Sequence, residues 1–390
     1  MINSNIKNIY KINSFLLILL TLISPPFVFA ELLSFGRGLR GIVMLTLIFF
    51  FFFQNRQIKK TSLVILYSLV FIIILEILTE RSKLSNIFSF YGLLLIIYMN
   101  YLTLKKKREY LDIFLNSFKV FSLYLSLAAI ISFLFHQFTI YNIDILNFET
   151  ISTFKPNYNY KMSIFGFTTV RNFGFFEIAR VSSFFNEPQY AGAFFLFNIL
   201  IAKTYKDYFS KKFIIVNFIA GLLTFSITFY LVYFVLWLIS FKKNIYYILI
   251  IPSFLFLIIV YYFDIHIYIF DYFYNNTSLG DRLERDTDAL KKIKDVPLLN
   301  LIIGNGLQGY LKFKTDEFGR YIASGYLNLF YDYGIIIFTL TITIIFLNFY
   351  KNYKILITLL VYLFAYPIYK YYFFWHFMVF MILYEKKIFN

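Results

Sequence analysis

Long apolar runs follow one another along nearly the whole chain, and short polar segments separate them. Each run has roughly 15 to 25 residues, and a helix of that length crosses about 30 Å of hydrocarbon, because it rises about 1.5 Å per residue. The runs lack the period-two alternation of membrane β-strands. The pattern therefore predicts an all-α fold, a polytopic bundle of transmembrane helices.

We expect about twelve spans, with edges set by the polar residues between the runs. The run at 213–241 is long for one helix, and a lysine pair lies on each side of it. Two short helices that turn near Ser226 to Thr228 keep both pairs on one side of the membrane. The expected spans are 12–30, 39–53, 62–79, 84–104, 116–138, 182–202, 213–225, 227–241, 245–263, 326–349, 355–369 and 371–384.

Basic residues concentrate in alternate connections between the runs. Cytoplasmic connections are enriched in Lys and Arg, so we assign this side and both termini to the cytoplasm. The net charge of +16 lies in short clusters and not along one helix face, so it does not indicate nucleic-acid binding. The clusters are Arg56, Lys59 and Lys60; Lys105 to Arg108; Lys203, Lys206, Lys211 and Lys212; Lys242 and Lys243; Lys351 and Lys354; and Lys386 and Lys387.

Composition supports the membrane assignment. Hydrophobic residues make up 60% of the chain, charged residues make up 15%, and the mean hydropathy is +0.70, which excludes an ordinary soluble protein. The first run ends in Val28-Phe29-Ala30, which resembles a signal-peptide cleavage site. We favour an uncleaved first span, since the Pro25-Pro26 pair is also normal in spans, and we treat residues 1–390 as a single membrane domain.

Two connections are much longer than the others, and the topology places both outside. They cover residues 139–181 and 264–325. Loops of this length are usually functional or disordered, and the aromatic and apolar content of these two favours order. The second predicts an amphipathic helix from Gly280 to about Lys294, followed by a break at Pro297.

Arg180 and Glu187 lie at the outer mouth of an apolar run, where charge is costly and is usually kept for a purpose. Pro188 favours the first turn of a helix. Arg180 can simply extend to the membrane interface, and Glu187 can pair with it or cap the helix. In the functional interpretation, Arg180 is a fixed cation for a phosphate and Glu187 orients it or handles protons.

The second long loop carries arginines around a glycine-rich stretch. Gly304-Asn305-Gly306 lacks the further glycine and the strand-to-helix context of a dinucleotide fold, so it predicts a tight, close-packed turn. Arg282 precedes this turn and Arg320 follows it. Basic residues on the predicted helix face, such as Arg285, are expected to be solvated.

The end of the same loop predicts the start of a helix. Ser324 and Gly325 form a typical helix entrance, whose exposed amides favour an anion, and Tyr326 follows them. Asp332 lies two turns further along. An acid at that depth is expected to face the bundle or a wet cavity.

Other chemistry is sparse. The histidines, His136, His266 and His376, lack metal-ligand spacing and are expected to be interfacial or core residues. The chain has no Cys, no phosphate-binding loop and no serine-hydrolase elbow. We therefore expect neither a metal nor another cofactor.

Taken in order, these segments resemble the O-antigen and capsule repeat-unit polymerases (Wzy-type) of the O-antigen ligase and polymerase superfamily. The resemblance rests on the many spans, the long outer loops and three degenerate motifs. The order and topology cover most of the chain, whereas the motifs lie between residues 180 and 335. They are Arg180 to Ala191, Arg282 to Gly306, and Ser324 to Ile335.

The resemblance implies a metal-independent glycosyltransferase of the bacterial inner membrane with a periplasmic active site. Such enzymes transfer a growing glycan from undecaprenyl diphosphate to the non-reducing end of an incoming lipid-linked repeat unit. The implied partners are these donor and acceptor lipids, the bilayer, a chain-length regulator and a flippase. The implied catalytic residues are Arg180, Glu187 and Asp332, and the substrate-binding residues are Arg282, Arg320, Ser324 and Tyr326.

The chain departs from the ligase branch of the superfamily at two places. That branch tends to carry His-Asn where this chain has Ser324-Gly325, and Ser-Arg where it has Ser226-Ile227. Loss of that histidine removes the ligase's candidate base, which favours a polymerase. A ligase that joins finished glycan to lipid A core or protein, and a non-enzymatic flippase of the same lipid-linked sugar, are the alternatives.

Overall fold

The structure is a computed structural model in which α-helices dominate. It describes residues 2–25, 27, 36–54, 84–137, 159–163, 166–172, 177–185, 187–240, 278–306 and 324–386. The expected spans at 62–79 and 245–263 lie outside these residues. Contacts group the chain into two compact units. The first comprises Met1–Leu78, Leu84–Tyr230 and Ile368–Asn390, and the second comprises Thr79–Lys83 and Leu231–Pro367.

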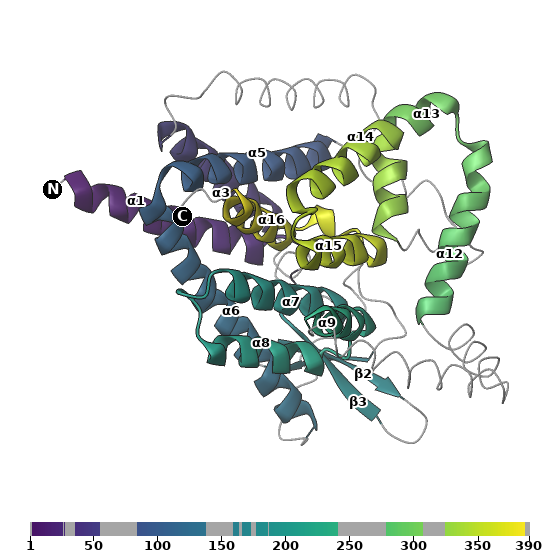
Figure 1. The fold of residues 1–390 in the computed structure, drawn as a ribbon, viewed down its shortest axis with the longest axis horizontal. Coiled ribbons are helices and arrows are strands. Elements are labelled where there is room, and N and C mark those ends of the chain that lie inside the picture. The colour runs from purple at the N-terminus through teal and green to yellow at the C-terminus, as the bar shows by residue number, and fades with distance from the viewer. Residues whose placement is uncertain are drawn as a thin grey trace. The chain divides into compact units, whose positions relative to one another are not determined.

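Helices in the first unit pack through aromatic side chains. Phe197 and Phe377 stack with ring centroids 4.2 Å apart, and Phe118 and Phe121 contact Phe194 edge-on or tilted. The helices are α1 (Ile2–Leu22), α3 (Gly36–Gln54), α5 (Leu84–Lys106), α6 (Arg108–Gln137), α7 (Pro188–Thr204), α8 (Lys211–Leu223) and α16 (Tyr372–Glu385), and α9 (Ile227–Ile239) begins in this unit (Figure 1).

Where α6, α7 and α8 meet, a polar network is buried in this apolar core. Asn198 on α7 donates from Nδ2 to Oδ1 of Asn217 on α8 at 2.8 Å. Ser126 on α6 donates to the same oxygen at 3.0 Å, and Ser122 donates to Oδ1 of Asn198 at 3.4 Å. All four residues have no exposed surface. Such bonds fix the register of helices that otherwise meet through interchangeable apolar contacts.

A three-stranded antiparallel sheet precedes α7, and the sequence analysis did not predict it. The strands are β1 (Asn159–Ser163), β2 (Gly166–Asn172) and β3 (Glu177–Ser183), in the order β1-β2-β3. Thr169 on β2 pairs with Arg180 on β3. Phe167 to Val170 in β2 are of types that favour β structure, but each strand is too short to form an apolar run.

The second unit contains α12 (Ser278–Lys292), α13 (Leu298–Ile303), α14 (Gly325–Phe349) and α15 (Tyr353–Ala365). Ala289 on α12, Val296 and Tyr331 on α14 form its buried cluster. The Tyr331 hydroxyl donates to the Ala289 carbonyl at 2.6 Å. The predicted amphipathic helix and its break at Pro297 are confirmed, since a short 3-10 turn follows α12 and Pro297 precedes α13.

One predicted division of the chain is confirmed, and two predicted boundaries are wrong. The 213–241 run forms two helices, α8 and α9, with a turn at Thr224 to Ser226. Since α9 continues from the first unit into the second, their pairing as a hairpin stays a prediction. The run predicted to begin at 182 begins instead at Pro188, because Arg180 to Ser183 belong to β3. The first helix lies at Ile2–Leu22, earlier than the expected 12–30.

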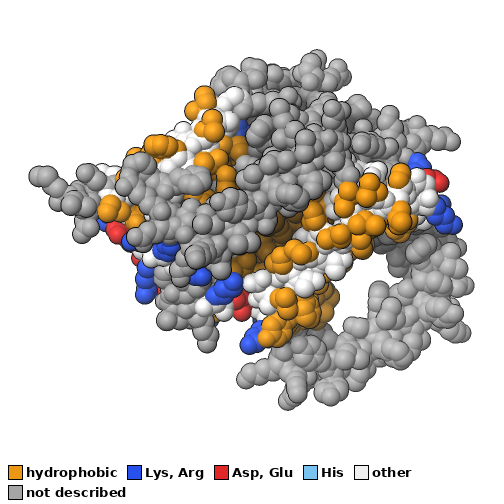
Figure 2. Space-filling model, turned by 90° about the horizontal axis from the view of Figure 1, so that it is seen from above, with side chains coloured by type: hydrophobic (Ala, Val, Ile, Leu, Met, Phe, Trp, Pro, Cys, Tyr) orange, Lys and Arg blue, Asp and Glu red, His pale blue; other side chains and the backbone are white. Residues whose placement is uncertain are grey.

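Among the described residues, α6 and α14 are long and apolar enough to cross a membrane. Hydrophobic side chains also make up much of the described surface in Figure 2. The twelve-span bundle, its orientation and its organisation as one membrane domain remain predictions.

Candidate functional site

Arg180 and Glu187 lie on either side of the junction between β3 and α7 (Figure 1). The strand ends at Ser183, whose φ of 52° turns the chain. Phe185 then forms an isolated antiparallel bridge with Phe27, and their rings lie 4.2 Å apart. The sheet and this bridge therefore fix the path of the chain from Arg180 into the apolar helix.

Glu187 holds the N-cap position of α7 in an extended conformation, and Pro188 opens the helix as predicted. The Glu187 side chain makes no capping hydrogen bond, so the capping interpretation is wrong. Instead, the Gln189 side-chain amide donates to the Glu187 carboxylate. The carboxylate is half-buried and is oriented by this contact, which leaves its second oxygen for another donor.

The α8–α9 turn packs against the first turns of α7. A side-chain carbon at Gly192 would lie 3.1 Å from Cβ of Ser226 and 3.2 Å from Oγ1 of Thr224, so only glycine leaves this packing undisturbed. Four residues beyond Ser226, on the same face of α9, Tyr230 lies within electrostatic range of Arg180. This packing brings the α8–α9 turn and strand β3, which carries Arg180, into one region of the first unit.

Two hydroxyl groups in this region were missed by sequence reasoning. Ser182 lies two residues after Arg180 on β3, and Ser226 opens α9, and both side chains are buried. Neither hydroxyl has a hydrogen-bond partner in the described part of the chain. Both residues lie in segments that the sequence analysis named, the 180–191 motif and the 213–241 turn, but no spacing marked either hydroxyl as part of a site.

In the second unit, Ser324 caps α14 as the sequence predicted. Its hydroxyl accepts from the Leu327 amide at 3.2 Å. The expected anion at this helix entrance is a side chain of the protein itself, because Oδ1 of Asp286 on α12 accepts from the Ser324 amide at 3.0 Å. A carboxylate stabilises the positive end of a helix dipole, so Asp286 ties α12 to α14.

Asp332 has no exposed surface and lies just before a break in α14. The break is at Gly334, with φ 74° and ψ 178°, a conformation essentially restricted to glycine. It diverts the backbone carbonyls of Tyr331 and Asp332 away from the helix. These carbonyls accept from the amides of Asn305 and Gly306 at 2.9 and 3.0 Å.

The predicted tight turn at Gly304 to Gly306 is confirmed, and it docks into this break. Gly304 has a φ of 84°, and a side-chain carbon there would lie 2.5 Å from the Tyr333 backbone. A carbon at Gly334 would lie 2.5 Å from the Gly304 nitrogen. Asn305 adds a side-chain bond to the Tyr331 carbonyl at 3.1 Å. Two glycine motifs that are far apart in the sequence thus form one packed junction beside Asp332.

The remaining predicted site residues are Tyr326, Arg282 and Arg320. The Tyr326 hydroxyl donates to the Leu360 carbonyl on α15 at 2.9 Å. Arg282 lies on α12, one helical turn before Asp286, and Arg320 lies outside the described residues. Arg180 and Glu187 therefore belong to the first unit, and Asp332, Arg282, Ser324 and Tyr326 belong to the second.

No group of three or more His, Cys, Asp or Glu side chains within the described ranges is arranged to hold a metal ion. His376 is a core residue. Its Nε2 lies 3.1 Å from the Thr21 hydroxyl, and its ring meets Phe114 edge-on. Comparison with protein-family models, with curated proteins and with solved structures finds no match.

Proposed function

We propose that the protein is a polysaccharide polymerase of the bacterial inner membrane that works on its periplasmic face. It transfers a growing glycan from undecaprenyl diphosphate to the non-reducing end of an incoming lipid-linked repeat unit. Its partners are these two lipids, together with a flippase that supplies the repeat unit and a chain-length regulator. Both chain termini lie in the cytoplasm.

The observation that carries the proposal is the junction between β3 and α7. There an arginine and a partly exposed carboxylate flank the start of an apolar helix whose side chains are almost all buried. A lipid diphosphate has an anionic head, and a guanidinium held on a strand at the start of an apolar helix matches that head. The buried hydroxyls of Ser182 and Ser226 add hydrogen-bond donors near the same region.

In the proposed reaction, the acceptor hydroxyl oxygen forms a bond to the anomeric carbon of the donor glycan. The bond from that carbon to the diphosphate oxygen breaks, and the electron pair leaves with undecaprenyl diphosphate. Arg180 stabilises the negative charge that develops on the leaving group. The proton of the acceptor hydroxyl passes to a carboxylate, so atoms and charge balance without a metal or a nucleotide.

Glu187 is the better proton acceptor of the two candidate carboxylates. A general base must come within hydrogen-bond reach of the proton that it removes. Glu187 is partly exposed, and its side chain is not used to cap the helix. Asp332 is fully enclosed beside the docked glycine turn, which suits a role in holding the α14 break.

Gene deletion with complementation tests the proposal. Deletion should leave surface polysaccharide of single repeat units on a gel, and the wild-type gene should restore the ladder. Arg180→Ala should fail to restore it, while Arg171→Ala, on the neighbouring strand, should restore it at equal protein level. Long polymer held on undecaprenyl diphosphate in the deletion strain would indicate a ligase. Lipid-linked units trapped in the cytoplasmic leaflet would indicate a flippase. A normal ladder in the deletion strain would refute the polymerase, the ligase and the flippase alike.

The role of Glu187 is tested by Glu187→Gln, which keeps the hydrogen-bonding shape and removes the basic oxygen. Loss of a general base typically lowers a rate about 10²- to 10⁴-fold. In membranes supplied with lipid-linked repeat units, we expect kcat to fall by such a factor with little change in KM. A variant that loses only affinity would make Glu187 a binding residue and not the base.

A further inference from the structure

The short helix α13 presents an apolar surface to its surroundings. Leu298 is 73% exposed, Leu299 is 60% exposed and Ile302 is 36% exposed. From Val296 to Gly306 the sequence contains no charged residue, whereas Lys291, Lys294 and Asp295 immediately precede it. Polarity therefore changes abruptly along the chain between α12 and α13.

The exposed leucines are held in place by the opposite side of α13. Leu301 packs against the buried cluster formed by Ala289, Val296 and Tyr331. The turn that follows α13 is fastened to α14 by the bonds from Asn305 and Gly306. The apolar surface is thus a fixed feature of the second unit and not the side of a loosely attached loop.

This surface lies beside the apolar exterior of α14. The carbon that an alanine would add at Gly334 falls within 2.5 Å of the Ile302 backbone, so α13 ends where the second half of α14 begins. Exposed aliphatic side chains continue along that half, including Ile336 at 54%, Leu340 at 56% and Leu347 at 65%. The helix that carries them is one of the two long and apolar enough to cross a membrane.

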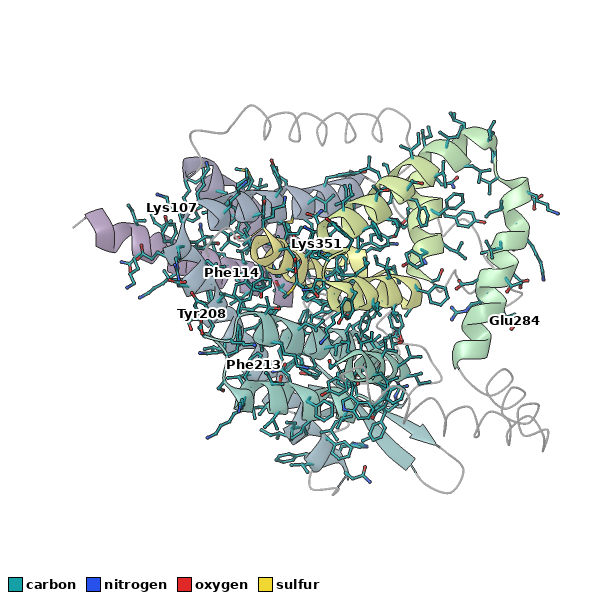
Figure 3. All side chains as sticks on the ribbon, viewed as in Figure 1. Lys107, Phe114, Tyr208, Phe213, Glu284 and Lys351 are labelled. Atoms are coloured by element: carbon teal, nitrogen blue, oxygen red, sulfur yellow. The ribbon has the colours of Figure 1, made fainter. Side chains whose placement is uncertain are left out.

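The exposed apolar surfaces of α13 and of the second half of α14 both match a lipid bilayer. The part of α14 beyond the break, residues 335–349, is about 22 Å long, which covers most of the roughly 30 Å of hydrocarbon. Lipid that surrounds α14 reaches the α13 leucines without interruption. The ion pair between Lys291 and Asp288, at 3.0 Å with the lysine 72% exposed, marks the side that stays in water. Glu284 is exposed as well, and Figure 3 shows it on the side of α12 turned away from α14 and α15.

We infer that α13 is a membrane anchor for the second long loop. Leu298, Leu299 and Ile302 enter the acyl region at the outer surface, while α12 stays at the water boundary. The anchor fixes the depth of the α14 break and holds Asp332 near the interface. This inference rests on the proposed membrane location and not on the proposed reaction.

Tryptophan fluorescence in bilayers with brominated lipids tests the anchor. The chain has two Trp residues and no Cys, so a Trp237→Phe, Trp375→Phe background allows one reporter at a time. The full-length protein is reconstituted into phosphatidylethanolamine and phosphatidylglycerol vesicles with bromine near the carbonyl end or near the methyl end of the acyl chains. The reporters are Leu299→Trp on α13, Leu340→Trp on α14 and Glu284→Trp on the water-facing side of α12.

We expect Leu299→Trp to be quenched about twofold by the shallow bromine and less by the deep one, since interfacial helices insert roughly 5–10 Å into the headgroup and acyl boundary. Leu340→Trp should also be quenched, and Glu284→Trp should not. Quenching at Leu340→Trp without quenching at Leu299→Trp overturns the anchor but keeps the membrane location. Absence of quenching at both overturns the anchor and the location together. A Leu298→Cys variant carrying an environment-sensitive fluorophore repeats the measurement if Leu299→Trp fails to fold.

Discussion

Replacing Gly334 with alanine tests the junction between the glycine turn and the α14 break. The residue has φ 74° and ψ 178°, a backbone region that side chains cost about 1–3 kcal/mol to occupy. The added carbon would also lie 2.5 Å from the Gly304 nitrogen, where backbone and not a flexible side chain must move. Overpacking of this kind costs a further 1–3 kcal/mol or so, for a total destabilisation of about 2–6 kcal/mol.

Gly38→Ala is the matched control. Gly38 lies in α3, and a carbon added there meets nothing within 4 Å. Alanine in an exposed helix is more favourable than glycine by roughly 0.5–1 kcal/mol, so this variant should be as stable as the wild type or slightly more stable.

Thermal unfolding of purified protein in detergent measures both variants. We expect the apparent midpoint of Gly334→Ala to fall by at least about 2 °C, because an unfolding entropy of ~2.1 cal/mol/K per residue over 390 residues converts 2 kcal/mol into about that shift. Gly304→Ala, on the other side of the junction, should behave alike, and the double variant should lose less than the sum, because both changes break one contact. Equal midpoints for Gly334→Ala and Gly38→Ala would refute the docked geometry.

Three further outcomes follow from buried polar contacts. Asn198→Leu should lower stability by about 1–3 kcal/mol in the same thermal assay, because it removes the bond to Asn217 and leaves the buried Ser122 hydroxyl without its acceptor. Adding Asn217→Leu should recover part of that loss, and a double variant with the full sum of the single losses would contradict the network. Asp286→Ala should lower stability by about 0.5–2 kcal/mol and speed hydrogen exchange at the Ser324 amide. Asp286→Asn should keep most of the protection, since its side-chain carbonyl still accepts. Equal exchange rates in the two variants would contradict the bond between Asp286 and the Ser324 amide.

Periodicity was sufficient to predict the helical parts of the fold. The runs at 84–104 and 326–349 appear as α5 and α14, and the lysine pairs around 213–241 were enough to predict that this run divides into two helices, α8 and α9. These predictions succeed because apolar length and flanking charge act locally. The sheet before α7 was missed because its strands are short and β2 and β3 lack a strict alternation of apolar and polar residues, although each strand pairs with its neighbour in the sequence.

The sequence predicted the roles of individual residues in the candidate site, but it did not predict which of them contact one another. Pro188 and Ser324 serve as helix-start residues because local backbone chemistry decides such roles. The carboxylate that meets the Ser324 amide comes from Asp286, which is 38 residues away. No spacing rule connects these two, and none connects Gly304 with Gly334. Such partners are fixed by tertiary packing, which a single sequence does not display.

The break in α14 also has a consequence for the order in which the protein assembles. The donors at Asn305 and Gly306 are synthesised before the carbonyls of Tyr331 and Asp332 that they serve, and Asn305 precedes Tyr331 by 26 residues. If α14 crosses the membrane as proposed, it enters the bilayer most favourably as an unbroken helix, because in hydrocarbon each backbone carbonyl without a donor costs several kcal/mol. The broken form becomes accessible only when the glycine turn is present to replace the lost bonds. On this reasoning, the buried carboxylate of Asp332 reaches its final surroundings in a docking step that follows membrane insertion.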